Sequence, residues 1–128
     1  MSGERDAAVA LATQAINKTA ATYETHLKDD VAAIKSFLDA GDIGSAQRRT
    51  QNIVGEAPGF GWPAAGEAAA VLRSILEADE QPKRAEATVI AMHALAVITT
   101  ENKRTRQGGG EKLLNQLNMM ADKLGITA

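Results

Sequence analysis

Hydrophobic residues recur at intervals of three and four along most of the chain, which is the spacing of one face of an α-helix. The first such stretch spans residues 6–24. A second apolar stripe runs from Tyr23 to Leu38, and it either continues the first helix or begins a new one near Thr25. The sequence Ala40-Gly41-Asp42 ends this region, because glycine suits the position after a helix and aspartate suits the N-cap of the next.

The same pattern predicts four further helices. One runs from about residue 43 to about residue 57, and after the turn Pro58–Trp62 a second runs from Pro63 to Leu76. A polar connection over residues 77–83 leads to an unusually apolar helix from Arg84 to about Thr105. Three consecutive glycines then interrupt the chain, because glycine loses the most backbone entropy in a helix. They precede a short last helix that is marked by leucines and ends at Gly125.

Composition supports this helical interpretation. Alanine accounts for 25 of the 128 residues, while aromatic residues make up only 3%. Alanine is the best helix former and is depleted in strands, so an all-β domain is excluded. We therefore expect one all-α domain over residues 1–128. Its predicted architecture is an antiparallel four-helix bundle with an additional N-terminal helical segment and a short C-terminal helix.

The charge balance limits the classes of partner. Fourteen basic and sixteen acidic residues give a net charge of -2, and nucleic-acid binding depends on neutralising phosphates, so we expect no nucleic-acid partner. The absence of cysteine excludes disulfides and thiolate chemistry. No apolar run reaches the roughly 20 residues of a membrane span, and the N-terminus leads into no signal-peptide core. We expect a cytoplasmic protein without a membrane partner.

Residues that commonly carry catalysis are sparse. The two histidines are His26, interpreted as a solvated helix residue, and His93, interpreted as a structural residue among apolar neighbours. The acidic pair Asp29-Asp30 is interpreted as exposed charge on a helix face. We predict no metal site, no cofactor and no enzymatic activity.

One segment stands out, because Gly55 lies near the end of a predicted helix and is followed by the turn Gly59-Phe60-Gly61. This arrangement resembles the central motif of the histidine-containing phosphotransfer (HPt) family. Its members are helical bundles that carry a phosphoryl group between histidine kinases and response-regulator receiver domains. The family motif is His-x-x-Lys-Gly, followed by a turn similar to Gly-Phe-Gly. Gly55 matches the family glycine, and residues 59–61 match the turn.

The resemblance places Gln51 at the phosphorylated histidine and Val54 at the lysine. A neutral imidazole nitrogen is a nucleophile that can carry a phosphoryl group, whereas a carboxamide nitrogen is not. Valine supplies no positive charge, although Arg48, one turn before Gln51, supplies some. The resemblance therefore implies a relative that cannot be phosphorylated at this position.

The rest of the motif favours binding. Gln51 and Gly55 are four residues apart and so share one face of the helix. Glycine costs a helix about 1 kcal/mol relative to alanine, which indicates a close approach either by a partner or by a neighbouring helix of the bundle. This face lies opposite Ile43, Ala46 and Ile53. The predicted partner-binding residues are Gln47, Arg48, Gln51, Asn52, Gly55 and Phe60.

The leading hypothesis is a non-phosphorylatable HPt-like adaptor of a two-component phosphorelay that binds a receiver domain or a histidine kinase. One alternative is a working phosphocarrier that uses His26 or His93. The other is a helical interaction module unrelated to phosphorelay, for example a homodimer formed through the apolar residues 88–98.

Overall fold

The computed structural model describes residues 2–78 and 84–126, and it describes side-chain surroundings from residue 21 onward. This part of the chain contains helices and no strand, as predicted. Of the predicted connection over residues 77–83, Glu77 belongs to the preceding helix and residues 79–83 lie outside the described residues. The helices are α1 (Ser2–Asp39), α2 (Ile43–Glu56), α3 (Pro63–Glu77), α4 (Arg84–Thr100) and α5 (Glu111–Lys123), with short turns of helix at Pro58–Phe60 and Arg106–Gly110.

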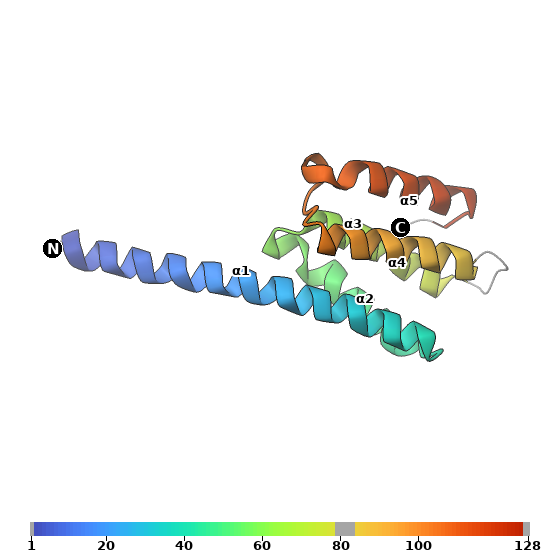
Figure 1. Cartoon of the computed structure of the whole chain (residues 1–128), viewed down its shortest axis with the longest axis horizontal. Helices are drawn as coiled ribbons and strands as arrows, with labels where there is room; N and C mark the ends of the chain where they lie inside the picture. Colours follow the sequence, from blue (N-terminus) through green and yellow to red (C-terminus); the bar gives the residue numbers. More distant parts are fainter. Residues whose placement is uncertain (1, 79–83, 127–128) are drawn as a thin grey trace.

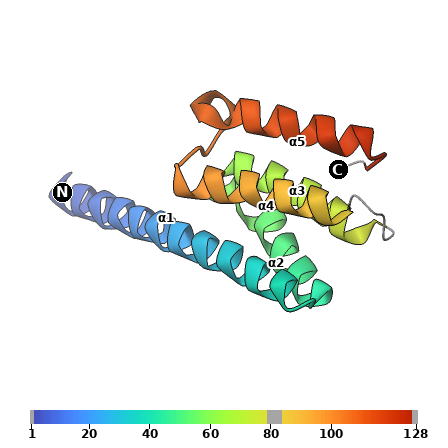
Figure 2. The same cartoon turned by 45° about the vertical axis from the view of Figure 1, so that its right-hand side comes forward.

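Helix α3 lies at the centre of the bundle, where it packs against α2, α4 and α5, while α1 packs against α2 and α4 (Figures 1 and 2). Helix α1 is continuous over 38 residues, so the two apolar stripes of the sequence belong to one helix. No glycine or proline occurs between Glu4 and Ala40, and nothing in that stretch breaks the helix. The N-terminal half of α1 extends beyond the other helices (Figure 1).

The boundary between α1 and α2 has the predicted chemistry. Gly41 adopts a φ of 76°, and the Asp42 N–H donates to the Phe37 carbonyl at 2.8 Å, which closes the end of α1. The Asp42 carboxylate caps α2 by accepting from the Ser45 N–H at 3.1 Å and from the Ser45 hydroxyl at 2.7 Å. These two hydrogen bonds, the hydroxyl's first, lower the pKa of Asp42.

The prediction for the end of α4 was wrong, because α4 ends at Thr100 and not near Thr105. Asn102 adopts a left-handed φ of 57°, which turns the chain out of the helix. The Lys103 N–H then donates to the Ile98 carbonyl at 2.9 Å. Asparagine is the residue that most often replaces glycine in this type of helix ending.

The core is built on small side chains. Helix α3 buries Ala64, Ala65, Ala68 and Ala69 completely, and this lets neighbouring helices approach its backbone closely. Larger side chains fill the remaining space from the other helices: Leu27, Ile34, Ile53, Leu95, Ile98, Leu114 and Leu117. The alanine content therefore serves tight packing around α3.

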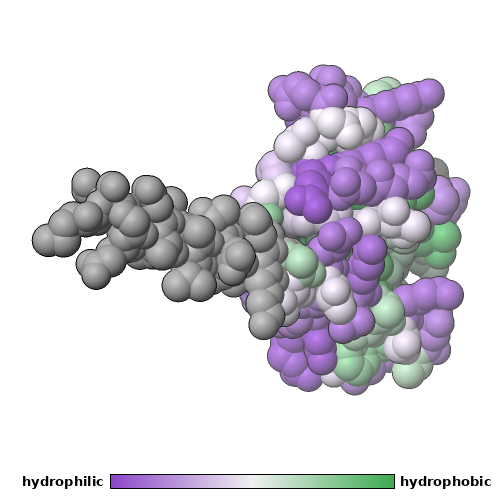
Figure 3. All heavy atoms as spheres, turned by 60° about the vertical axis from the view of Figure 1, so that its left-hand side comes forward, coloured by the Kyte–Doolittle hydropathy of each residue, from purple (hydrophilic) through white to green (hydrophobic). Residues whose placement is uncertain are grey.

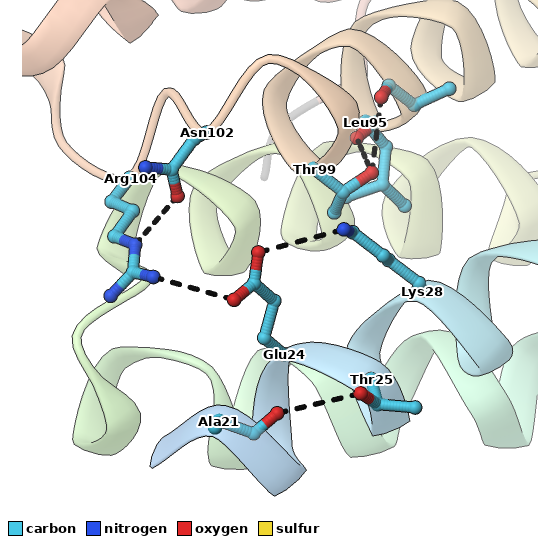
Figure 4. A network of polar contacts seen from close by, with 9 residues as sticks. Ala21, Glu24, Thr25, Lys28, Leu95, Thr99, Asn102 and Arg104 are labelled. Carbon is cyan, nitrogen blue, oxygen red and sulfur yellow. Dashed lines mark hydrogen bonds and ion pairs between the residues drawn. The ribbon is translucent and has the colours of Figure 1, made fainter. Parts of the chain in front are cut away.

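Arg104 ties the connection after α4 to the rest of the bundle. Its guanidinium lies 3.7 Å from a carboxylate oxygen of Glu24 on α1, and its Nε donates to Oδ1 of Asn102 at 2.7 Å. Figure 4 shows both contacts. The same guanidinium lies 4.6 Å from the ring centre of the buried Trp62, and the Arg104 carbonyl accepts from the Ala64 N–H at 2.9 Å. These contacts fix the start of α3 and with it the α2–α3 hairpin.

In the part of the chain that the structure describes, no helix combines the length and the apolar character needed to cross a membrane.

Candidate functional site

Helix α2 turns its polar side to solvent. Its inward positions Ala46, Thr50 and Ile53 are buried, and the Thr50 hydroxyl is satisfied by the Ala46 carbonyl at 2.7 Å. The exposed residues of the helix include Arg48, Gln51, Asn52, Gly55 and Glu56. A partner can therefore reach Gln51 at mid-helix, as a docking role requires, while the role itself stays a prediction.

Gly55 is not explained by packing within the bundle. A Cβ atom built at this position would meet no atom within 4 Å outside its own helix turn. The sequence left two explanations for this glycine, close approach by a partner or by a neighbouring helix. Among the described residues, no neighbouring helix comes close enough to require it. What remains is the flat, open surface that glycine leaves beside Gln51, onto which a partner's backbone or side chain can settle.

Arg73 of α3 supplies the positive charge that the motif itself lacks. Its Nη1 donates to Oε1 of Gln51 at 3.1 Å. Gln51 consequently presents its amide N–H groups to an incoming acceptor. Arg48, the cation expected from the sequence, donates to the Ser45 hydroxyl at 2.9 Å near the start of α2, and Val54 is half-buried against the core.

Sequence reasoning missed Arg73, although the sequence contains a signal for it. Gln51 and Arg73 each lie eleven residues from Trp62, which sits at the turn between α2 and α3. In two antiparallel helices of equal rise, residues equidistant from the turn come side by side. Gln47 lies within one residue of the same register, since its Nε2 donates to the Leu76 carbonyl at 3.1 Å.

An open hollow of about 850 Å³ runs along this side of α2. Its lining residues are Phe37, Gly44, Ser45, Gln47, Arg48, Arg49, Gln51, Asn52 and Glu77. The hollow brings together several amide groups and two arginines, of which Arg49 is paired with Asp30, and its one carboxylate is that of Glu77. A surface of this kind favours carboxylate or phosphoryl oxygens on a partner.

The interpretation of Asp30 as an exposed charge was wrong, and the contacts of this residue lie where the α2 face meets α1. Asp30 is not an exposed charge, since its side chain is 1% exposed. Its Oδ1 lies 2.9 Å from Nη1 of Arg49, and its Oδ2 lies 3.3 Å from Nε2 of His26. The same His26 nitrogen lies 4.0 Å from a carboxylate oxygen of Glu56 on α2. Asp30 thus links α1 to α2 through an ion pair in which the carboxylate is buried and the Arg49 side chain is 43% exposed.

Phe60 also meets α1, because its ring stacks on that of Tyr23 with centroids 4.3 Å apart and planes within 5°. Phe60 remains exposed on its outer side, while Tyr23 is buried. The Tyr23 hydroxyl has no hydrogen-bond partner among the described residues. Burial, together with the negative charges of Glu56 and Asp30, raises the pKa of Tyr23 to about 12.

His93 lies on α4 with an exposed side chain, away from the residues that line the α2 hollow. Within residues 21–78 and 84–126, no group of three or more histidine, cysteine, aspartate or glutamate side chains is placed to hold a metal ion. The groups that the α2 face offers to a partner are amides, guanidinium groups and the open backbone at Gly55.

The chain gives no significant match to any family model, any curated protein or any solved structure.

Proposed function

We propose that the chain is an HPt-like adaptor that binds a response-regulator receiver domain or a histidine kinase through the exposed face of α2. It accepts no phosphoryl group at position 51. The observation that carries the proposal is the exposure of Gln51 at mid-helix, beside the open surface at Gly55 and hydrogen-bonded to Arg73.

The chemistry of this arrangement suits recognition of an acidic surface. A receiver domain accepts its phosphoryl group on an aspartate, so its docking surface presents oxygen acceptors. The amide N–H groups of Gln51 donate to such acceptors, and Arg73 adds positive charge at the same point. Neither side chain is a phosphoryl-accepting nucleophile. Occupancy of a receiver or kinase, without transfer, is then how the protein modulates signalling.

Binding to a panel of receiver domains tests this proposal. In titrations by calorimetry, we expect Gly55→Trp to weaken binding about tenfold or more, because the indole covers the open surface at the centre of the contact. Gln51→Glu should also weaken it, since it replaces the donating amide by a carboxylate that repels an acidic surface and pairs with Arg73. The matched control is Asp122→Trp, which adds the same indole at an exposed position on α5. Receiver binding that is indifferent to both changes on α2 contradicts the docking face.

A second function is favoured by a specific observation at His26. Its side chain is 49% exposed, and its Nε2 faces the carboxylates of Asp30 and Glu56. Two carboxylates beside Nε2 favour the tautomer with the proton on that nitrogen, which leaves the lone pair on Nδ1. In a phosphocarrier, that lone pair would attack phosphorus as the bond to an acyl-phosphate oxygen breaks and the carboxylate departs. Asp30 would stabilise the resulting cationic ring.

Incubation with a phosphorylated receiver, using a labelled phosphoryl group, separates the two functions. Acid-labile label that is lost in His26→Ala and retained in His93→Ala supports the carrier. No label on the unaltered chain, together with stable receiver binding, supports the adaptor.

A further inference from the structure

The surface between α4 and α5 is unusually apolar for an exposed face. Two large exposed apolar side chains of the described residues line the groove between these helices, Ile90 of α4 (42% exposed) and Met119 of α5 (60%), and a third, Val89 (68%), is exposed on α4. The face shown in Figure 3, by contrast, is mainly hydrophilic, with hydrophobic colour confined to small areas. Helix α4 therefore carries apolar residues on its outer side as well as on its core side, which indicates that another surface covers it.

An open groove of about 360 Å³ runs between the two helices. Its α4 wall consists of Glu86, Ala87 and Ile90, and its α5 wall consists of Gln116, Met119, Met120, Lys123 and Leu124. The groove is therefore lined mainly by apolar side chains, with one acidic residue, Glu86, on the α4 wall and one basic residue, Lys123, on the α5 wall. Neither Glu86 nor Lys123 forms an ion pair within the described part of the chain.

We propose that this α4–α5 face is the interface of a homodimer with two-fold symmetry. A two-fold axis that runs along the groove, in the plane of the interface, sets the α4 wall of one copy against the α5 wall of the other. Glu86 of each copy then faces Lys123 of the second copy, and Ile90 faces Met119. The groove is therefore complementary to itself in charge, and methionine side chains adapt readily to such a contact.

The size of the face sets the expected strength. Helix α4 has 17 residues and is about 25 Å long, and two packed helices span about 20 Å, so each copy buries about 500 Å². Stable interfaces bury about 800 Å² on each partner, which places this dimer in the weaker, micromolar class. The α2 face is not part of this interface, and each copy keeps its docking surface.

Sedimentation analysis of the full chain, from micromolar to sub-millimolar concentration, tests the dimer. The unaltered chain should pass from monomer to dimer over this range. Ile90→Glu and Met119→Glu should each raise the dissociation constant about tenfold or more, because each buries an unpaired charge in the contact. Gly55→Trp on α2 is the matched control and should dimerise like the unaltered chain.

A charge reversal makes the test specific to the proposed geometry. Lys123→Glu should weaken the dimer, and Glu86→Lys in the same chain should restore it, since the pair is then re-formed with the signs exchanged. A chain that stays monomeric throughout the range overturns the proposal and leaves the groove for a helix of another protein. A dimer unaffected by Ile90→Glu, or a reversal that fails to restore association, overturns it as well. Loss of receiver binding in Gly55→Trp bears only on the α2 face, so the two proposals fail separately.

Discussion

Asp30 is a buried carboxylate at the contact between α1 and α2. Burying a carboxylate is costly unless a cation and hydrogen bonds compensate it. Arg49 approaches it from α2 at 2.9 Å, and His26 approaches it from within α1. The edge of the α2 face is thereby fixed relative to α1.

Arg49→Met should destabilise the fold by about 2 kcal/mol, because Asp30 is left buried without its cation while the apolar stem of the side chain is kept. The measurement is the free energy of unfolding in urea. Adding Asp30→Asn to Arg49→Met should recover part of the loss, since no charge then remains to be compensated. An equal or larger loss in the double variant contradicts this role for Asp30.

Tyr23 makes the molecule sensitive to alkaline pH. Burial, Glu56 and Asp30 raise its pKa from 10.0 to about 12, so the native state holds the proton after the unfolded state has released it. The resulting contribution to stability is fully present below pH 10 and is lost as the pH rises through about 12. Tyr23 is the only tyrosine of the chain, so its absorbance change reports this ionisation directly.

We expect Tyr23 to ionise near pH 12 in the native protein and near pH 10 in the urea-unfolded protein. Tyr23→Phe keeps the ring that stacks on Phe60 and removes the unpaired hydroxyl. This variant should be as stable as the unaltered chain, or more stable by up to about 1 kcal/mol, at neutral pH. A native titration near pH 10 would show that Tyr23 is not buried as described.

At the scale of elements, helix boundaries were predictable where a single residue type sets them. The residue type predicts that Gly41 ends a helix, that Asp42 caps the next one and that Pro63 begins another. The structure shows all three roles. The end of α4 was harder, because Asn102 occupies a left-handed position that glycine more often takes.

Part of the candidate site was predictable from patterns within one helix, and part was not. The periodicity of α2 predicts which of its residues face solvent, and Gln51, Asn52 and Gly55 do so. Arg73 depends on the register of two helices across a turn, and the burial of Asp30 depends on how α1 crosses α2. Pairing between distant segments is a tertiary property, which patterns within one helix do not encode.

The connection after α4 offers a test at this scale. Arg104→Ala removes the ion pair to Glu24, the bond to Asn102 and the contact with the Trp62 ring. We expect a loss of about 1 kcal/mol in the free energy of unfolding, because the ion pair is partly exposed and the cation–π contact accounts for most of the effect. Trp62 is the only tryptophan, so its fluorescence should change in the native state. An unchanged emission spectrum would mean that Arg104 does not contact the ring.

At the scale of the whole molecule, the N-terminal half of α1 extends beyond the bundle (Figure 1). Deleting residues 2–20 should therefore keep cooperative unfolding, with a melting temperature within a few degrees of the full chain. The total helical signal in circular dichroism should fall in proportion to the residues removed. Loss of the cooperative transition would show that this half of α1 supports the fold.

The two proposed surfaces, one on α2 and one on α4 and α5, use different helices. The first is polar and carries the motif that resembles the HPt family, and the second is apolar with one charge on each wall. A homodimer of this geometry would present two α2 faces, so that one assembly could engage two receiver domains.

The central claim is that the α2 face binds a receiver domain, and residue-resolved NMR tests it most directly. An isotope-labelled chain is titrated with receiver domains, and the amide shifts are followed. We predict that the shift changes gather at Arg48, Gln51, Asn52 and Gly55 of α2 and at Arg73 of α3. Shift changes that gather on α4 and α5 while α2 stays unperturbed, or no change with any receiver, would contradict the account.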